Sequence, residues 1–188
     1  MIVGIKENDR VVLGWSDWIL PEVNDKDKVL KDNLPFKVVK EKGIVVCSYW
    51  RLPDTDIFFA DEKLMKEITK DEVTYERMIN DVVPLLEKIA TENDLFDEDG
   101  KLNNCFTVAQ TDKLYDVMST EYVRDVTDFF VHGSSVDYMK GSLAYSRGRP
   151  AEERIEEGFR FHAKMMNERV FPIVLINTKT LCPQVITE

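Results

Sequence analysis

The chain has 188 residues, of which 44% are hydrophobic and 10% aromatic, enough to enclose one sizeable core but short for two. Its net charge of −10 disfavours binding to nucleic acid and to anionic membranes, because their phosphates would repel it. No stretch approaches the roughly 20 apolar residues of a membrane-spanning helix, and no secretory signal opens the chain. We therefore expect a single cytoplasmic domain over residues 1–188 that binds neither nucleic acid nor membrane.

Two hairpins open the predicted secondary structure. Residues 2–6 and 10–16 are mostly apolar β-formers around a polar turn, which is typical of a hairpin. Residues 36–40 and 44–50 predict a second hairpin, with Gly43 placed for a turn that needs positive φ.

A loop and a long helix are expected next. Residues 51–62 contain Pro53 and three aspartates, which favour a loop. From about 69 to 92, apolar residues recur at steps of three and four, which predicts an amphipathic helix. The apolar stripe consists of Met78, Val82, Leu85, Leu86 and Ile89. Pro84 lies within this helix and should kink or split it.

The second half of the chain predicts a hairpin, a strand, two helices and a closing strand. These elements span residues 105–110 and 113–117, 125–132, 136–145, 150–166 and 171–177. Strands and helices do not alternate as in βαβ units, so the sequence predicts an α+β fold in which hairpins form antiparallel sheets with helices on their outer faces.

The sequence predicts neither a disulfide framework nor a metal site, and no cofactor. The three cysteines are far apart: Cys47, Cys105 and Cys182. An odd number at such spacing indicates free thiols in a reducing compartment. Residues 97–104 look like a calcium loop around Gly100, but Leu95 and Phe106 would then occupy the first and twelfth ligand positions, which need oxygen donors.

Several sequence segments resemble the proteasome β-subunit and HslV family of N-terminal-nucleophile hydrolases. They are the opening hairpin up to Asp17 and residues 43–48, 108–115, 132–135 and 173–179. Together they span nearly the whole chain in the family's order. The resemblance implies a four-layer αββα sandwich of two antiparallel sheets flanked by helices. It also implies a homo-oligomer, with ring or face-to-face contacts made by the helices.

The family's nucleophile is the hydroxyl or thiol of the first residue, with its own α-amine as base. Here the first residue is Met1, whose thioether has no proton to lose, and removing it would expose Ile2. The family's lysine on the third strand would fall near Leu34, between Lys31 and Lys37. The resemblance therefore implies a fold that has lost its nucleophile.

Two other positions match the family's site. Asp17 stands where the family has an acid, and Ser134, after Gly133, stands where the family has a supporting serine. Each has a structural alternative, because Asp17 can end a strand and Ser134 can cap the following helix. The family's Asp-x-x-Ser near the last helix has no match, since residues 167–170 read Asn-Glu-Arg-Val.

A pocket beside these positions is a further hypothesis. Its candidate residues are Trp15, Trp18, Trp50 and His132. The tryptophans can equally pack at a sheet edge or in an oligomer contact. His162 lies on the apolar stripe of the last helix and is expected to be a partly buried helix residue. No local motif supports Cys47 or Cys105 as a nucleophile paired with a histidine.

Three functions remain open from the sequence. The first is a catalytically silent, self-assembling structural or binding subunit with Met1, Asp17, Gly133 and Ser134 as a vestigial site. The second is a peptidase or amidohydrolase of the N-terminal-nucleophile class with a processed or unrecognised nucleophile. The third is a module that binds a small molecule or peptide in the vestigial cleft. The sequence does not decide whether the protein is an enzyme.

Overall fold

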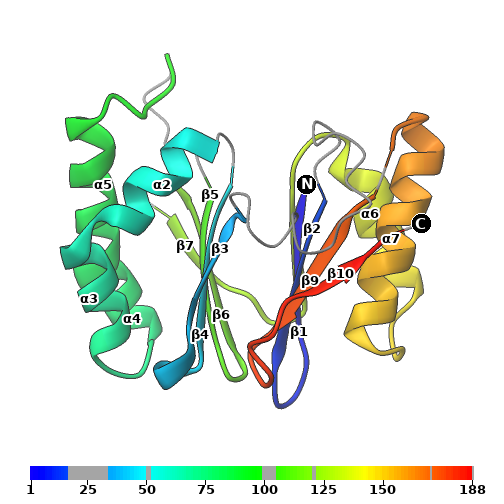
Figure 1. Cartoon of the computed structure of the whole chain (residues 1–188), viewed down its shortest axis with the longest axis horizontal. Helices are drawn as coiled ribbons and strands as arrows, with labels where there is room; N and C mark the ends of the chain where they lie inside the picture. The colour runs from blue at the N-terminus through cyan, green and yellow to red at the C-terminus, as the bar shows by residue number, and fades with distance from the viewer. Residues whose placement is uncertain (17–33, 50–51, 99–104, 120–121, 170, 188) are drawn as a thin grey trace. The chain divides into compact units, whose positions relative to one another are not determined.

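A computed structural model describes residues 1–16, 34–49, 52–98, 105–119, 122–169 and 171–187. Contacts divide the chain into two compact units, one of residues 1–34 with 128–188 and the other of residues 35–127. Within the described residues, each unit contains one five-stranded antiparallel sheet. Helices cover one face of each sheet (Figure 1).

The sheet of the first unit has the strand order β10-β9-β2-β1-β8. Its strands are β1 Ile2–Lys6, β2 Val11–Ser16, β8 Phe129–His132, β9 Ile173–Asn177 and β10 Gln184–Ile186. Ile2 on β1 lies opposite Trp15 on β2 and opposite His132 on β8. The hairpin predicted over residues 2–16 is confirmed and lies inside the sheet.

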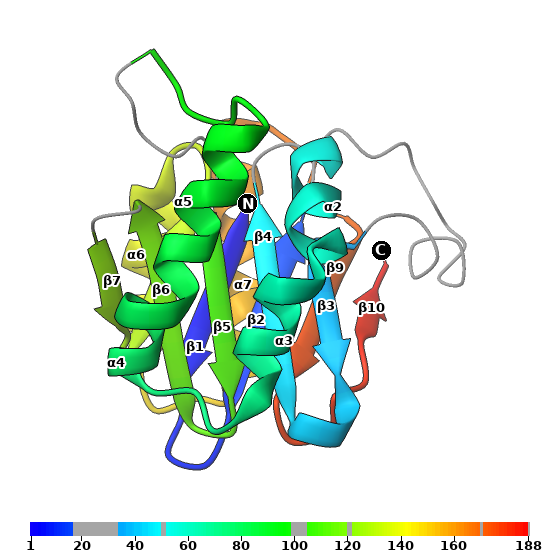
Figure 2. The ribbon, with the colours of Figure 1, turned by 90° about the vertical axis from the view of Figure 1, so that its left-hand side faces the viewer.

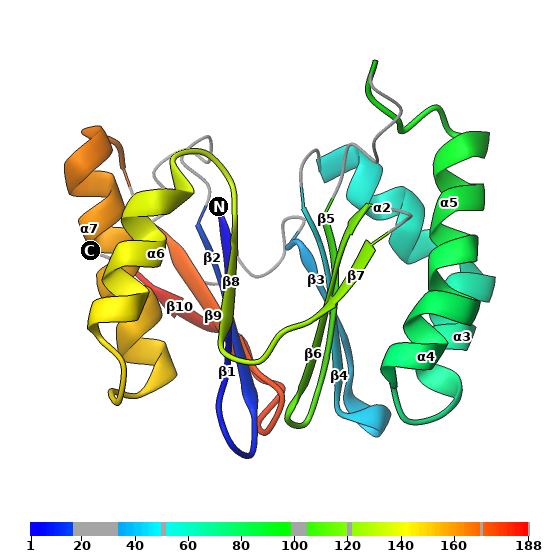
Figure 3. The ribbon, with the colours of Figure 1, turned by 180° about the vertical axis from the view of Figure 1, so that it is seen from behind.

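Helices α6 (Val136–Tyr145) and α7 (Ala151–Met166) cover one face of this sheet (Figure 3). Both helices were predicted and are confirmed. The core beneath them is apolar and consists of Met1, Val3, Ile5, Val12, Val131, Met139, Leu143, Ala151, Ile155, Phe159, Ile173 and Leu175. Alternate residues of each strand point to the helices, so one face of every strand is committed to this core.

Two glycines set how closely α7 packs. A Cβ on Gly14 of β2 would lie 2.4 Å from Cγ2 of Ile155, so the strand approaches the helix at a distance that no side chain fits. A Cβ on Gly158 of α7 would lie 2.3 Å from the sulfur of Met139 on α6. Both contacts leave α7 seated directly on its neighbours.

The sheet of the second unit follows chain order, β3-β4-β5-β6-β7. Its strands are β3 Phe36–Val39, β4 Ile44–Tyr49, β5 Cys105–Gln110, β6 Lys113–Ser119 and β7 Tyr122–Asp125. The turn between β3 and β4 is a short 3-10 helix, η1 (Lys40–Lys42), ended by Gly43 at φ 65°. Both predicted hairpins of this unit are confirmed.

The helices of the second unit lie on one face of its sheet (Figure 2). They are α2 Leu52–Ala60, α3 Glu62–Lys70, α4 Tyr75–Arg77, the π-helical turn η2 Met78–Val82 and α5 Val83–Glu92. The predicted apolar stripe is confirmed, because Met78, Val82, Leu86 and Ile89 pack in the core of this unit. Leu85 is partly buried and packs against the edge of that core.

Two predictions in this region were wrong. Residues 51–62 were expected to form a loop, but α2 begins at Leu52. Its proline is the second residue of the helix, and a proline is tolerated in the first helical turn because the missing N–H would have no partner there. The helix expected from residue 69 begins at Tyr75, where the Thr74 hydroxyl accepts a hydrogen bond from the Arg77 N–H. The irregularity expected at Pro84 is the π-helical turn just before it.

The strand expected over residues 125–132 was wrong at its start. Its second half is confirmed as β8, which begins at Phe129, but Asp125 is the last residue of β7, and β7 and β8 lie in different sheets. The short connection carries no glycine or proline to mark it in the sequence. The strand expected to close the fold is β9, but the three-residue edge strand β10 follows it. Among the described residues, no helix is long and apolar enough to cross a membrane.

We predict that Gly14→Ala lowers the free energy of unfolding by about 1–3 kcal/mol, because the new methyl group overlaps Ile155 in a packed core. Gly158→Ala should cost less than about 1 kcal/mol, since the flexible Met139 thioether can move and alanine favours helix. Urea unfolding of the two variants checks this. Equal losses would show that α7 does not depend on the close approach to β2.

Candidate functional site

The start of β1 is fixed to the end of β2 by two main-chain hydrogen bonds. The α-amine of Met1 donates to the Ser16 carbonyl oxygen at 2.7 Å. The Ser16 N–H donates to the Met1 carbonyl oxygen at 3.1 Å. Residue 1 is therefore part of the sheet ladder, and only 7% of its surface is exposed.

The side chain of Met1 belongs to the helix-covered core of the first unit, on the same face of β1 as Val3. Gly133 makes room for it. A Cβ on Gly133 would lie 3.1 Å from the Met1 Cα and 3.2 Å from its Cβ, and Gly133 has φ 140°. The structure thus brings together two of the sequence-predicted site residues, with the methionine side chain packed as a core residue.

Ser134 follows Gly133 but is exposed. Its carbonyl oxygen lies 3.2 Å from Nε2 of the buried His162, which donates the hydrogen bond. The alternative role of Ser134 as helix cap was wrong, because the N-cap of α6 is Ser135, in the left-handed region at φ 51°. His162 is a buried residue of α7, as predicted.

Trp15 and His132 lie in one row across the other face of the sheet, on either side of Ile2. Trp15 is almost fully buried, and the His132 ring lies 5.1 Å from the Phe130 ring, centroid to centroid. This row is on the opposite face from the Met1 side chain, since neighbouring strand residues alternate. Asp17, Trp18 and Trp50 lie outside the described residues.

Of the two candidates for the family's lysine, Lys31 lies outside the described residues. Lys37 is on β3, where its Nζ donates to the Phe59 carbonyl oxygen of α2 and lies 5.9 Å from the centroid of the Phe59 ring. It pairs in register with Val46, a residue of the helix-covered core of the second unit. Lys37 therefore points to the helices of its own unit.

The thiols differ in their surroundings. Cys47 is buried, Cys105 is half-buried and Cys182 is exposed. Burial raises the pKa of Cys47 well above its usual value, and the nearby Cys105 and Asp116 raise this pKa further. Because the thiolate is the reactive form, Cys47 is a poor candidate nucleophile.

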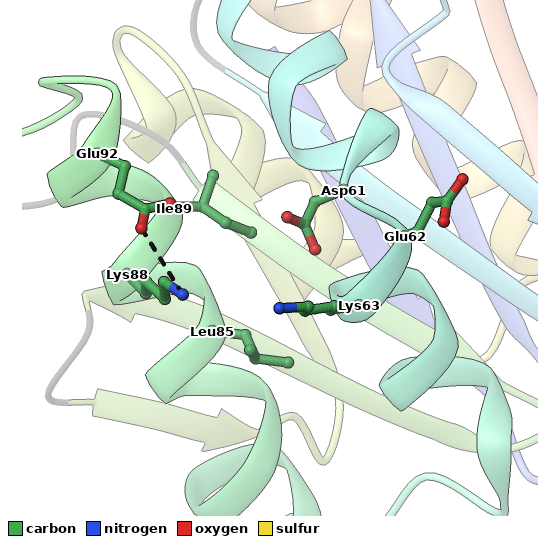
Figure 4. Close-up of a pocket in the computed structure, with 7 residues that line it drawn as sticks. All are labelled: Asp61, Glu62, Lys63, Leu85, Lys88, Ile89 and Glu92. Carbon is green, nitrogen blue, oxygen red and sulfur yellow. Dashed lines mark ion pairs between the residues drawn. The ribbon is translucent and has the colours of Figure 1, made fainter.

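Among the described residues, hollows lie between α3 and α5 and between α6 and α7. The sequence did not predict them, because each forms where the outer faces of two helices meet. One, of about 290 Å³, lies between α3 and α5 (Figure 4). Its charged side chains are Asp61, Glu62, Lys63, Lys88 and Glu92. Three of these charged groups are already engaged, since Asp61 accepts the Leu64 N–H at 2.7 Å and Lys88 pairs with Glu92 at 3.7 Å.

The second hollow, of about 520 Å³, lies between α6 and α7 and is mostly apolar. Its lining consists of Asp137, Tyr138, Gly141, Ser142, Tyr145, Glu157 and Phe161. Within the described parts of the chain, no group of three or more His, Cys, Asp or Glu side chains is placed to hold a metal ion.

No protein-family model matches the sequence, and no curated protein does. Solved structures do match the fold. BPH of Thiobacillus denitrificans superposes with a TM-score of 0.69 at 15% identity, covering 97% of this chain and 99% of that one. Anbu, an ancestral β-subunit from Yersinia bercovieri, gives 0.64 at 13% identity, covering 100% and 87%. HslV from Trypanosoma brucei gives 0.59 at 13% identity, covering 94% and 97%.

These matches extend over nearly the whole chain, and they show the fold. The chain has the fold of proteasome-type β-subunits, which is the N-terminal-nucleophile hydrolase fold. The sequence segments that resemble this family predicted that fold. The α+β class with two antiparallel sheets and flanking helices is confirmed.

We predict that Gly133→Ala destabilises the protein more than Gly148→Ala does. Both glycines have a positive φ that disfavours alanine, which costs about 1–2 kcal/mol. Only at Gly133 does the added methyl group also press on the Met1 main chain, so we expect at least about 1 kcal/mol more. Denaturant unfolding measures the difference, and equal losses would contradict a tight fit of Met1 against Gly133.

Thiol labelling of the native protein at pH 8 should modify Cys182 rapidly. Cys47 should react at least about a hundredfold more slowly, because it is buried and its raised pKa leaves little thiolate. Mass spectrometry of the labelled peptides follows both rates, with unfolded protein as the control. Fast labelling of Cys47 would restore it as a candidate nucleophile.

Proposed function

We propose that this protein is a catalytically silent proteasome-type subunit that self-assembles and serves as a structural or binding subunit. The observation that carries the proposal is Met1. Methionine stands at the start of β1, where this fold's nucleophile would be, and its thioether is packed in the core beneath α6 and α7. Covalent catalysis of this class needs a hydroxyl or thiol at that position.

The surroundings of Met1 support the same reading. The α-amine of Met1 is the group that this class uses as its base, but a base alone has no nucleophile to activate. Its hydrogen bond to the Ser16 carbonyl oxygen fixes it in the sheet. Lys37 donates a hydrogen bond to the Phe59 carbonyl oxygen in the last turn of α2. Its positive charge therefore stabilises the C-terminal end of that helix.

Self-assembly is supported by the fold. A helical assembly of the Anbu complex from Pseudomonas aeruginosa has been solved, and its subunit matches all of this chain with a TM-score of 0.65 at 15% identity. We propose that this chain likewise forms a homo-oligomer, as a single domain in the cytoplasm. Its function as a subunit would then rest on its surfaces and not on covalent chemistry.

The proposed lack of catalytic activity can be tested with epoxomicin. This compound is bound in a solved complex of T. denitrificans BPH. We expect the intact mass to stay that of the unmodified chain, and no turnover of a broad panel of peptide and acyl substrates. The matched control is Met1→Thr, given a free N-terminus by removal of a cleavable tag and treated in the same way.

An epoxomicin adduct on residue 1 of the unaltered protein would contradict the proposal. Intact mass of protein purified from its native host provides a second check. A mass that places Thr, Ser or Cys at the mature N-terminus would favour the alternative of a processed hydrolase.

A further inference from the structure

We propose that the hollow between α3 and α5 binds the zwitterion of a free α-amino acid with an apolar side chain. We call it the α3–α5 hollow. Its lining offers a carboxylate, an ammonium group and an apolar floor to one small ligand. All of these groups lie in the second unit, so the inference goes beyond the proposed function and depends neither on residue 1 nor on self-assembly.

The carboxylate is that of Asp61, which is held in place at the start of α3. Its Oδ1 accepts the Leu64 N–H at 2.7 Å, and its carbonyl oxygen accepts the Met65 N–H at 3.1 Å. Its Oδ2 receives no hydrogen bond from any described residue, and Figure 4 shows the carboxylate turned toward α5. The helix cap therefore fixes this side chain before a ligand arrives, and one oxygen stays available to accept a hydrogen bond from an ammonium group.

The ammonium group is that of Lys63, whose Nζ points across the hollow to α5 (Figure 4). Within the described part of the chain, this side chain makes no ion pair or hydrogen bond. Asp61 is only two residues away, and residues two apart along a helix do not face each other. Glu67, four residues on, is the usual helical partner, but its carboxylate pairs with Arg77 at 3.1 Å. Opposite charges thus line one hollow without neutralising each other.

The apolar floor comes from α5. Leu85 and Ile89 line the hollow, and Figure 4 shows both side chains directed toward α3. Ile89 is buried in the core of the unit and Leu85 packs against the edge of that core, so both side chains are fixed. They offer a surface on which an apolar ligand side chain is removed from water, and this burial contributes affinity that exposed charges alone do not.

The size of the hollow limits the ligand. Its volume of about 290 Å³ lies just below the range of roughly 300–1,000 Å³ that is typical of pockets for drug-sized molecules. A single amino acid is a ligand of the size that such a hollow can surround.

The charges of the lining favour a ligand that carries both signs. The lining has three carboxylates, of Asp61, Glu62 and Glu92, and two ammonium groups, of Lys63 and Lys88. An anion would meet these carboxylates in a unit of net charge −8, and a cation would lie beside the two ammonium groups. Lys88 and Glu92 already pair with each other at 3.7 Å. The ligand ammonium therefore donates to Asp61 and the ligand carboxylate accepts from Lys63.

Isothermal titration calorimetry with the full chain tests this recognition. We expect L-leucine to bind with a Kd of about 1 mM or tighter, as a ligand of this size allows. Isocaproic acid is leucine without its ammonium group, and isoamylamine is leucine without its carboxylate. Each should bind at least about tenfold more weakly, because each leaves one charged group of the hollow without its partner.

Two substitutions remove the charges and keep the helix. Asp61→Asn retains the N-cap, since asparagine caps a helix as well as aspartate does, and Lys63→Gln retains a good helix former. Each should raise the Kd for L-leucine at least about fivefold. The matched control is Lys66→Gln on the same helix, at a residue that does not line the hollow, and it should leave the Kd unchanged. Thermal melts without ligand should give the same Tm for all three variants.

Three outcomes would overturn the inference. The first is that none of L-leucine, L-isoleucine and L-methionine binds at concentrations up to about 10 mM, tenfold above the expected Kd. The second is that isocaproic acid binds as tightly as leucine, which would show that no carboxylate recognises the ligand ammonium. The third is that neither Asp61→Asn nor Lys63→Gln weakens binding, which would place the ligand outside the α3–α5 hollow. An epoxomicin adduct on residue 1 would contradict the proposed function alone, because residue 1 does not line this hollow.

Discussion

The close seating of α7 on β2 is the constraint on which the first unit depends. Gly14 allows the helix to rest against the strand with Ile155 in the place of a side chain, and Gly158 allows Met139 of α6 to reach the α7 backbone. Both glycines allow this packing because they have no side chain. The two contacts differ in stiffness, because the Met139 thioether at Gly158 can move, whereas the branched Ile155 side chain against Gly14 cannot do so without disturbing the core.

Fold and chemistry are separable at residue 1. The ladder bonds between Met1 and Ser16 use only main-chain atoms, so they are indifferent to the side chain that residue 1 carries. A thioether buried under α7 adds hydrophobic stabilisation of about 1.5–3 kcal/mol, where a hydroxyl would need a hydrogen-bond partner. Gly133 is then explained by packing against Met1 and requires no catalytic role. The side chain at the start of β1 can therefore vary without loss of the main-chain ladder that holds residue 1.

Sequence reasoning succeeded where the signal is local. The hairpins and the helices α6 and α7 follow from alternation, turn residues and three- and four-residue periodicity, and their order predicted the fold. It failed at α2, where a proline in the first helical turn looks like a loop residue. It failed between Asp125 and Phe129, where the strand changes sheet, since no nearby residue marks a change that depends on distant partners. The position of Met1 was predictable from the resemblance. Its packing in the core and the hollow at Gly141 were not, because both depend on how separate elements meet.

The distribution of charge limits how such a subunit can associate. Residues 35–127 carry a net charge of −8 out of the −10 of the whole chain, so contacts between the helix-bearing faces of two second units would be repulsive at low salt and only partly screened at physiological salt. The stretch from Val136 to Met166, with six basic and five acidic side chains, carries no such penalty. Most of the net negative charge is therefore carried by residues 35–127, whereas exposed aromatic side chains lie in both units: Tyr75 and Tyr122 in one, and Tyr138, Tyr145 and Phe161 in the other. The uneven distribution of charge, more than the distribution of apolar surface, therefore directs self-association away from residues 35–127.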